Sequence, residues 1–247
     1  MTAVAVIQAR MTSTRLPGKI LMPLAGKPIL TRVIERARAI QGIDTIVVAI
    51  PEGGAHEPVA SLCRDLDIPV TRGSEQDVLK RTAMAAEAHG AEIVMRLTSD
   101  CPFLDPGVSA AILAAFRAGG AAYASNAMES GYPLGFDTQV TSMKALREAD
   151  AEAADPYERE HVTPFVWRRP ERYPALYLDH RPNLRTWRLV VDTQEDYAMA
   201  CRVYDALAPR DPMFGLDALR ALFAARPDLL AMNAQVKQTP YEGLPRA

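Results

Sequence analysis

The first half of the sequence predicts an α/β fold with a mostly parallel central sheet. Short apolar runs alternate with segments whose apolar residues recur every three or four positions, and this alternation occurs four times before residue 120. A loop rich in cations and hydroxyl groups directly follows the first run. Strands that alternate with helices form parallel sheets with right-handed crossovers, and such sheets bind ligands at the carboxyl ends of their strands.

Each element of this half has its own signal. Residues 4–7 form the first apolar run, and residues 46–50 form another, which Pro51 ends. Between them, residues 28–40 show the helical spacing of apolar residues, with a proline suited to the first turn. The other elements expected here are helices at residues 57–66, 75–89 and 107–117 and strands at residues 69–71 and 93–97.

The second half is less regular, and its elements are expected from shorter patterns. We expect strands at residues 121–125, 136–140, 173–179 and 187–191 and helices at residues 143–151, 160–168, 195–207 and 216–225. Thr193 is a suitable N-cap for the third of these helices, because acidic residues follow it in the first turn. A loop is expected at residues 128–135, and the tail after residue 233 has only a weak pattern.

The composition narrows the class of protein. Apolar residues make up 49% of the 247 residues and the net charge is −2, so the chain has no basic field that would attract nucleic acid. Cys63, Cys101 and Cys201 are widely spaced and odd in number, which argues against a disulfide framework or a zinc site. No apolar run approaches the ~20 residues of a membrane span, and the N-terminus lacks a signal-peptide pattern. We therefore expect a cytoplasmic protein with neither a nucleic-acid nor a membrane partner.

The loop after the first strand is the strongest functional signal. It places the cations Arg10, Arg15 and Lys19 among three hydroxyl side chains, one of them Ser13. Backbone N–H groups and hydroxyls at such a position bind phosphates, and the cations offset the phosphate charge. With the single glycine Gly18, the loop matches neither a Walker A motif nor a dinucleotide fingerprint. We expect a polyphosphate site here, and a solvated basic turn is the alternative.

Two aspartates follow expected strands that are far apart in the sequence. Asp100 comes shortly after residues 93–97, and Asp192 comes directly after residues 187–191. Mg²⁺ is usually held by one or two carboxylates together with phosphates and waters, and Mn²⁺ accepts the same oxygen ligands. The pair therefore predicts a metal site beside the polyphosphate. Each aspartate alone also fits a turn or a helix cap.

Two further polar segments supply candidate residues. Gly73, Ser74 and Asp77 lie between a strand and a helix, where their polar atoms can reach a nucleotide base, although helix capping by Ser74 explains them equally well. Arg159 and His161 stand in a charged run before an apolar segment. The planar fork of Arg159 suits an acceptor carboxylate or phosphate, and a surface ion pair is its alternative. His161 fits either an acceptor contact or an ordinary surface position.

Taken together, these motifs resemble a known family. The run from Arg10 to Lys19, RMTSTRLPGK, followed by GKP at residues 26–28, resembles the signature of the sugar cytidylyltransferases that act on 3-deoxy-manno-octulosonate and acylneuraminate. Four later motifs resemble the spore-coat polysaccharide (SpsF-type) branch: Thr98-Ser-Asp-Cys-Pro-Phe-Leu-Asp105, Gly135-Phe-Asp-Thr-Gln139, Arg159-Glu-His-Val-Thr-Pro164 and Val191-Asp-Thr-Gln-Glu-Asp196. The resemblance covers the chain from Ala3 to about Leu207.

The resemblance implies a GT-A-like, Rossmann-like nucleotidyltransferase fold and an activity. CMP would pass from CTP to an acidic sugar or a related acceptor, with release of pyrophosphate, in surface polysaccharide or glycoconjugate biosynthesis. Arg10, Lys19 and Asp100 would be catalytic, and Asp100 and Asp192 would hold Mg²⁺. The nucleotide-binding residues implied are Gln8, Ala9, Arg10, Ser13, Arg15, Lys19, Gly73, Ser74, Asp77 and Thr98. The acceptor-binding residues implied are Gly135, Asp137, Arg159 and His161.

The resemblance also implies an organisation, and it leaves alternatives. We expect one domain over residues 1–247, with a nucleotide-binding half at 1–120, a small irregular acceptor and dimerisation region at 121–207, and a C-terminal helix and tail at 208–247. Dimers are common in the family, so a homodimer is expected. The chain has Ser99-Asp-Cys-Pro102 where the octulosonate enzymes usually have Gly-Asp-Glu-Pro. The resemblance therefore does not determine which acceptor the protein uses.

Other functions remain possible on the sequence. A guanylyl- or uridylyltransferase that acts on a sugar 1-phosphate would use the same site with a different base pocket. A GT-A glycosyltransferase is a further alternative, although such enzymes typically carry an Asp-x-Asp motif, and here Cys101 and Pro102 follow Asp100. A non-catalytic nucleotide sensor is the last.

Overall fold

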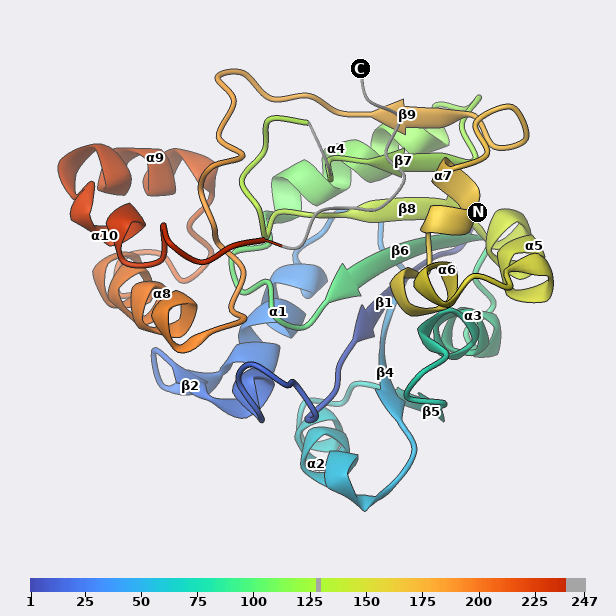
Figure 1. Ribbon diagram of the computed structural model, residues 1–247, viewed down its shortest axis with the longest axis horizontal. Helices are drawn as coiled ribbons and strands as arrows, with labels where there is room; N and C mark the ends of the chain where they lie inside the picture. The colour runs from blue at the N-terminus through green and yellow to red at the C-terminus, as the bar shows by residue number, and fades with distance from the viewer. Residues whose placement is uncertain (128–129, 239–247) are drawn as a thin grey trace.

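The computed structural model describes residues 1–127 and 130–238 (Figure 1). Within this range the centre is a seven-stranded sheet of order β5-β4-β1-β6-β8-β7-β9. Its parallel strands are β1 (Ala3–Gln8), β4 (Thr45–Pro51), β5 (Val70–Gly73) and β6 (Ile93–Thr98). β8 (Gln139–Ser142) runs antiparallel to β6 and to β7 (Tyr123–Ser125), and β9 (Ala175–Tyr177) runs parallel to β7. The expected α/β class with a mostly parallel sheet is confirmed.

The order of the strands determines where a ligand can bind. From β1 the chain passes to β4 and β5 on one side, then crosses to β6 on the other side of β1. The last residues of the two neighbouring strands, Gln8 and Thr98, are paired in register. Where the strand order reverses in this way, a crevice opens at the carboxyl ends of the strands. The segments that follow Gln8 and Thr98 therefore face one another.

Helices cover both faces of the sheet. One face carries α1 (Ile29–Arg38), α2 (Glu57–Asp65) and α4 (Pro106–Arg117), and the other carries α3 (Val78–Ala88), α5 (Met143–Glu152), α6 (Pro156–His161) and α7 (Pro164–Trp167). The side chains of β1 alternate between the two layers: Ala5 and Ile7 join the first core, and Val4 and Val6 join the second. Burial on both faces explains the uninterrupted apolar run of this strand.

A third apolar cluster lies beside the sheet, at the left of Figure 1. It joins α8 (Gln194–Leu207), α9 (Leu216–Ala225) and α10 (Asp228–Ala231) to the small hairpin of β2 (Pro23–Leu24) and β3 (Lys27–Pro28). The ring of Tyr204 packs against Phe103 and Phe214, with centroids 5.4 and 5.0 Å away. This packing anchors α8, and Asp192 lies just before the start of that helix. No helix among the described residues is long and apolar enough to cross a membrane.

Several expected elements differ in the structure. The helix expected at 160–168 is two short helices, α6 and α7, because Val162 adopts a left-handed φ of 72° between them. The strand expected at 136–140 begins only at Gln139, and α3 begins at Val78 because Asp77, not Ser74, accepts the capping hydrogen bond from the N–H of Lys80. The expected loop at 128–135 lies partly outside the described residues, as does the end of the tail.

The strand expected at 187–191 is also absent from the sheet. This segment instead runs along the loop before β8: Arg188 forms an isolated bridge with Leu134, and the N–H of Leu189 donates to the carbonyl of Leu134 at 2.7 Å. Leu189 and Val191 are buried in the third cluster, and Val190 packs with Cys101 and Leu134, so none of them lies in a strand of the sheet. The apolar run therefore indicated burial correctly, but not pairing.

Candidate active site

A cavity of about 560 Å³ opens at the carboxyl ends of β1 and β6. The loop after β1, the turn after β6, helix α6 and the segment before α8 contribute to its lining. Its volume is that of a site for a small molecule or cofactor. The point between β1 and β6 at which the order of the strands reverses therefore coincides with a cavity.

The loop after β1 is closed by backbone contacts. Gly18 has φ of 70°, and its N–H donates to the carbonyl of Met11 at 3.0 Å. The N–H of Met11 in turn donates to Nδ1 of His56, at 3.3 Å, so the histidine is neutral. Burial lowers the pKa of His56, and Arg81 and Arg72 lower it further against the opposing effect of Glu75. The loop is thus closed on both sides, and Lys19 starts the short 3-10 helix η1 (Lys19–Leu21) at its end.

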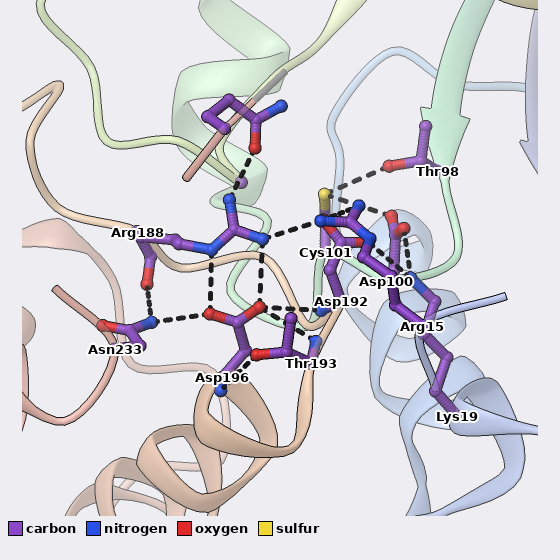
Figure 2. A network of polar contacts seen from close by, with 12 residues as sticks. Arg15, Lys19, Thr98, Asp100, Cys101, Arg188, Asp192, Thr193, Asp196 and Asn233 are labelled. Carbon is purple, nitrogen blue, oxygen red and sulfur yellow. Dashed lines mark hydrogen bonds and ion pairs between the residues drawn. The ribbon is translucent and has the colours of Figure 1, made fainter. Parts of the chain in front are cut away.

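The ammonium of Lys19 lies between the two aspartates that the sequence singled out. Nζ donates to Oδ2 of Asp100 and to Oδ1 of Asp192, at 2.8 Å each (Figure 2). The two carboxylate oxygens are therefore no farther apart than twice that distance. Burial by itself lowers the pKa of Lys19, but the charges of the two aspartates outweigh it and raise the pKa above its usual value. Burial raises the pKa of Asp100, and the contact with Lys19 more than reverses this effect.

Asp192 makes two further ion pairs on its other oxygen. Nη2 of Arg15 and Nη2 of Arg188 both lie 2.9 Å from Oδ2 of Asp192. Arg188 is 6% exposed, and it donates to the fully buried Asp196 from Nε at 2.8 Å and from Nη2 at 3.0 Å. Asn233 donates to Oδ1 of Asp196 and to the carbonyl of Arg188, at 2.9 Å each (Figure 2). Asp192 is thus held by a buried polar network.

The start of α8 completes this network. Thr193 and Asp196 form a capping box: the N–H groups of Asp192 and Thr193 both donate to Oδ2 of Asp196 at 3.0 Å. The expected capping by Thr193 is confirmed. Asp192 itself does not cap the helix, and its carboxylate is directed at Lys19, Arg15 and Arg188.

Most of the expected site residues line the cavity. Those that do are Gln8, Ala9, Arg10, Ser13, Arg15, Lys19, Thr98, Asp100, Asp137, His161 and Asp192. They come from the ends of β1 and β6, the segment before β8, helix α6 and the segment before α8. The structure therefore brings together residues that are more than 180 positions apart in the sequence.

Five expected residues are not among those that line it: Gly73, Ser74, Asp77, Gly135 and Arg159. Arg159 makes contacts of its own away from the cavity lining. Its Nε donates to Asp77 at 3.0 Å, its Nη1 to the carbonyl of Asp150 at 2.6 Å, and its Nη2 to both carboxylates. The guanidinium therefore connects the start of α3 to the end of α5, as the ion-pair alternative describes, and its role toward an acceptor stays a prediction.

Gly73, Ser74 and Gly135 have structural roles outside the cavity lining. A Cβ on Gly135 would lie 2.6 Å from the carbonyl group of Leu189, so this glycine allows the loop before β8 to pass the segment before α8. Gly73 ends β5, and its carbonyl accepts from the N–H of Glu52 at 2.9 Å. Ser74 accepts from the N–H of Asp77 at 3.1 Å, which makes it a turn residue before α3.

Several residues of the cavity wall were not predicted from the sequence. Among them are Arg81, Arg96, Tyr157, Glu160 and Gln238. Arg96 had a usable signal, because a charged residue in an apolar central strand needs a partner: its Nε donates to Gln8 at 2.6 Å and its Nη1 to Gln139 at 2.8 Å. Arg81 is 2% exposed and lies one turn after Val78 on α3. Gln238 had no local signal in the sequence, because only the fold brings it to Arg188. Nη1 of Arg188 donates to Oε1 of Gln238 at 2.5 Å.

Comparison with known proteins identifies the family. The family model described as cytidylyltransferase matches residues 4–239. The chain belongs to the cytidylyltransferase family. It is therefore a nucleotidyltransferase, and the family to which the sequence motifs pointed is confirmed. The spore coat polysaccharide biosynthesis protein SpsF of Bacillus subtilis is 32% identical over 90% of this cytidylyltransferase and 94% of its own length.

Other relatives support the same membership and the fold. A 3-deoxy-manno-octulosonate cytidylyltransferase of Anaeromyxobacter dehalogenans is 35% identical over 46% of this chain and 47% of its own. The solved structure of a cytidylyltransferase from Leptospira borgpetersenii has a TM-score of 0.89 at 26% identity, covering 98% of this chain and 100% of that one. A CMP:2-keto-3-deoxy-manno-octonic acid synthetase solved with CTP has a TM-score of 0.64 at 17% identity, covering 83% and 99%. The nucleotidyltransferase fold is thus confirmed.

Proposed function

We propose that this protein is a Mg²⁺-dependent cytidylyltransferase that transfers CMP from CTP to an acidic sugar or a related acceptor, with release of pyrophosphate. The observation that carries the proposal is the contact of Lys19 with Asp100 and Asp192 at the carboxyl ends of β1 and β6. The loop that follows β1 adds Arg10 and Arg15 to the same cavity. Family membership supports CTP as the nucleotide. The names of the relatives from B. subtilis and A. dehalogenans support a sugar as the acceptor.

The donor set fits a divalent cation. Mg²⁺ is commonly bound by one or two carboxylates together with substrate phosphates, and Asp100 and Asp192 meet at the phosphate loop. A mycobacterial neighbour of the same fold, Rv0371c, was solved in complex with manganese, with a TM-score of 0.59 at 16% identity over 82% of this chain and 99% of that one. Asp100 and Asp192 would hold the ion, which would supply Lewis-acid stabilisation of phosphate charge.

The residues of the chain would divide the remaining work. Arg10, Ser13, Arg15 and Lys19 would bind and orient the triphosphate, and Asp137 and His161, which also line the cavity, would face the acceptor. An acceptor oxygen attacks the α-phosphorus in line: the new P–O bond forms while the bond to the β-phosphate breaks, and pyrophosphate leaves. Such a reaction depends mainly on positioning and on fixed positive charge, both of which this cavity offers. A carboxylate or phosphate acceptor would need no general base, whereas an anomeric hydroxyl would have to give up its proton, for instance to Asp192.

Pyrophosphate release in a matrix of nucleotides and acceptors tests the proposal. Purified protein with Mg²⁺ is incubated with CTP, UTP, GTP or ATP and with acidic sugars or sugar 1-phosphates, and the products are identified by mass spectrometry. A CMP-linked product formed from CTP supports the proposal. A product formed only from GTP or UTP with a sugar 1-phosphate would favour the alternative transferase, and no turnover with any pair would favour a nucleotide sensor.

Two finer expectations remain predictions. The protein would act in the cytoplasm, as an enzyme that uses CTP does, and it would form a homodimer. Light scattering coupled to size-exclusion chromatography measures the mass in solution against the 27.0 kDa of one chain. A mass of one chain at micromolar concentration would contradict the homodimer without affecting the proposed reaction.

A further inference from the structure

The cation that bridges the two carboxylates in this structure belongs to the protein itself. Nζ of Lys19 is 2.8 Å from an oxygen of Asp100 and 2.8 Å from an oxygen of Asp192, and the lysine is only 6% exposed (Figure 2). A Mg²⁺ ion bound to both oxygens needs distances of about 2.0–2.1 Å to each. The ammonium and the ion would therefore occupy the same space, and one excludes the other.

The charges around this position are already balanced. Within the part of the chain that the structure describes, the contacts at this cluster join three cations to three carboxylates: Arg15, Lys19, Arg188, Asp100, Asp192 and Asp196. A divalent cation added to this set would meet no net negative charge. A triphosphate changes the balance, because it attracts the ammonium and the guanidinium of Arg15 away from the carboxylates.

The carboxylates and the lysine differ in how firmly they are held. Asp192 is fixed by Arg188, and its backbone is fixed by the buried Asp196. The backbone carbonyl of Asp100 accepts from the N–H of Val191 at 2.9 Å. The backbone of Lys19 is held by the η1 turn, but its charge sits at the end of a flexible four-carbon chain. The ammonium can leave while the pair of carboxylates stays in place.

We propose that Lys19 acts as an internal cation that closes the carboxylate pair to metal until a triphosphate draws its ammonium away. The proposal rests on the metal site of the proposed function and adds a condition to it. Metal binds weakly to the nucleotide-free protein, and the nucleotide and the metal favour each other's binding. Because coupling between two ligands is reciprocal, metal also strengthens nucleotide binding. The lysine thereby prevents idle occupation of the site by free metal.

Binding of Mn²⁺ alone, without nucleotide, tests this role of Lys19. Mn²⁺ affinity is measured by electron paramagnetic resonance for the wild type, Lys19→Met and Arg15→Met. Arg15→Met is the matched control, because it also removes one positive charge next to Asp192 but leaves the ammonium between the carboxylates. We expect Lys19→Met to bind Mn²⁺ roughly tenfold tighter than the wild type or more, and Arg15→Met to change the affinity only a few-fold. Adding Asp192→Asn to Lys19→Met should abolish the gain.

Three outcomes would overturn the inference. Equal Mn²⁺ affinity in the wild type and Lys19→Met would show that the ammonium does not block the site. An equal gain in Arg15→Met would reduce the effect to general charge, and no Mn²⁺ binding by any variant would remove the metal site. Lys19→Gln replaces Lys19→Met if thermal unfolding shows that the methionine variant is not folded. Since CTP turnover by the wild type is measured separately, failure here is distinguishable from failure of the proposed function.

Discussion

The backbone N–H of Val191 donates to the carbonyl of Asp100 at 2.9 Å, and this bond joins the turn after β6 to the segment before α8. It brings two carboxylates that are 92 positions apart, those of Asp100 and Asp192, to the same ammonium. Neither segment pairs with the other in the sheet, so the contact does not follow from strand order. It follows from the packing within the third apolar cluster, where Phe103, after β6, lies against Tyr204 of α8 with ring centroids 5.4 Å apart.

Lys19→Met should lower turnover by roughly 10²–10³-fold, because it removes a positive charge that would stabilise the leaving phosphates. Steady-state pyrophosphate release measures the effect. Lys27→Met is the matched control, since Lys27 is a half-exposed lysine of the β3 hairpin that pairs with Glu35 and lies outside the cavity lining. Turnover near the wild-type value in Lys19→Met would remove the lysine from the phosphate site.

Arg188→Lys should raise the Mg²⁺ concentration required for half-maximal activity, because lysine keeps the charge but loses the fork that holds Asp192 and Asp196 together. The variant is also expected to lose stability, so a second buried arginine serves as the control. Arg36 is 1% exposed and bonds Tyr204, Leu104 and Phe214, away from the cavity. Arg36→Lys should lower the melting temperature without changing the Mg²⁺ requirement. The same Mg²⁺ requirement in both variants would show that Arg188 is purely structural.

Much of the fold could be predicted from the sequence, because its signals are local. The alternation of apolar runs and helical spacing marked β1, β4 and β6, and α9 was predicted at its observed bounds. The loop after β1 and Asp100 were predicted at the cavity for the same reason, because a cavity in an α/β protein lies where its strands end. These predictions needed no knowledge of long-range contacts.

The rest depends on contacts between distant segments. Arg159 looked like an anion binder because its charge stood in a polar run, but Asp77, 82 positions away, takes up its donors. Gln238 reaches Arg188, 50 positions away, only through the packing of the C-terminal helices. Apolar periodicity also cannot distinguish a strand in the sheet from a buried extended segment, which is why residues 187–191 were placed wrongly.

Arg159→Met should affect stability and leave catalysis unchanged. It removes the charged hydrogen bonds to Asp77 and Asp150. Because all three side chains are partly exposed, we expect the free energy of unfolding to fall by about 1–3 kcal/mol. In a domain of this size that loss lowers the melting temperature by roughly 2–4 °C per kcal/mol. The KM values for nucleotide and acceptor should stay as in the wild type. A selective rise in the KM of the acceptor would restore Arg159 to the acceptor site.

The loop around Met11 should loosen as the pH falls. Nδ1 of His56 accepts from the N–H of Met11 only when the imidazole is neutral, and burial lowers the pKa of His56 below its ordinary value of 6.5. Between the two pKa values the unfolded chain binds more protons than the folded one, so stability rises with pH. The contribution is complete above about pH 6.5 and is lost as the pH falls through the folded pKa.

Urea unfolding between about pH 5 and 8 measures this effect. His56→Gln should flatten the dependence, whereas His89→Gln, at the C-terminal end of α3, should not. Glu75, Arg72 and Arg81 face His56 and are left unchanged in both variants. An identical pH dependence in the wild type and His56→Gln would assign the acid sensitivity to other groups.

Asp137 offers the sharpest test of the acceptor side of the cavity. Its Oδ1 is held by Nη1 of Arg185 at 2.8 Å, which fixes a carboxylate in the lining of the cavity. A fixed carboxylate accepts hydrogen bonds from hydroxyl groups, which a sugar acceptor supplies and a triphosphate does not. Asp137→Asn should therefore raise the KM of the acceptor by roughly 10–100-fold, because a charged hydrogen bond contributes about 1.5–3 kcal/mol. The KM of CTP should stay unchanged.

The control for Asp137→Asn is Asp155→Asn. Asp155 is also an aspartate in an ion pair with an arginine, Arg168, but it caps α6 outside the cavity lining. Asp155→Asn should change neither KM. Because the two substitutions remove the same charge, any difference between them reports the position of the carboxylate rather than the loss of charge. If Asp137→Asn raised both KM values equally, Asp137 would act by holding the cavity wall in place, and the acceptor would bind elsewhere.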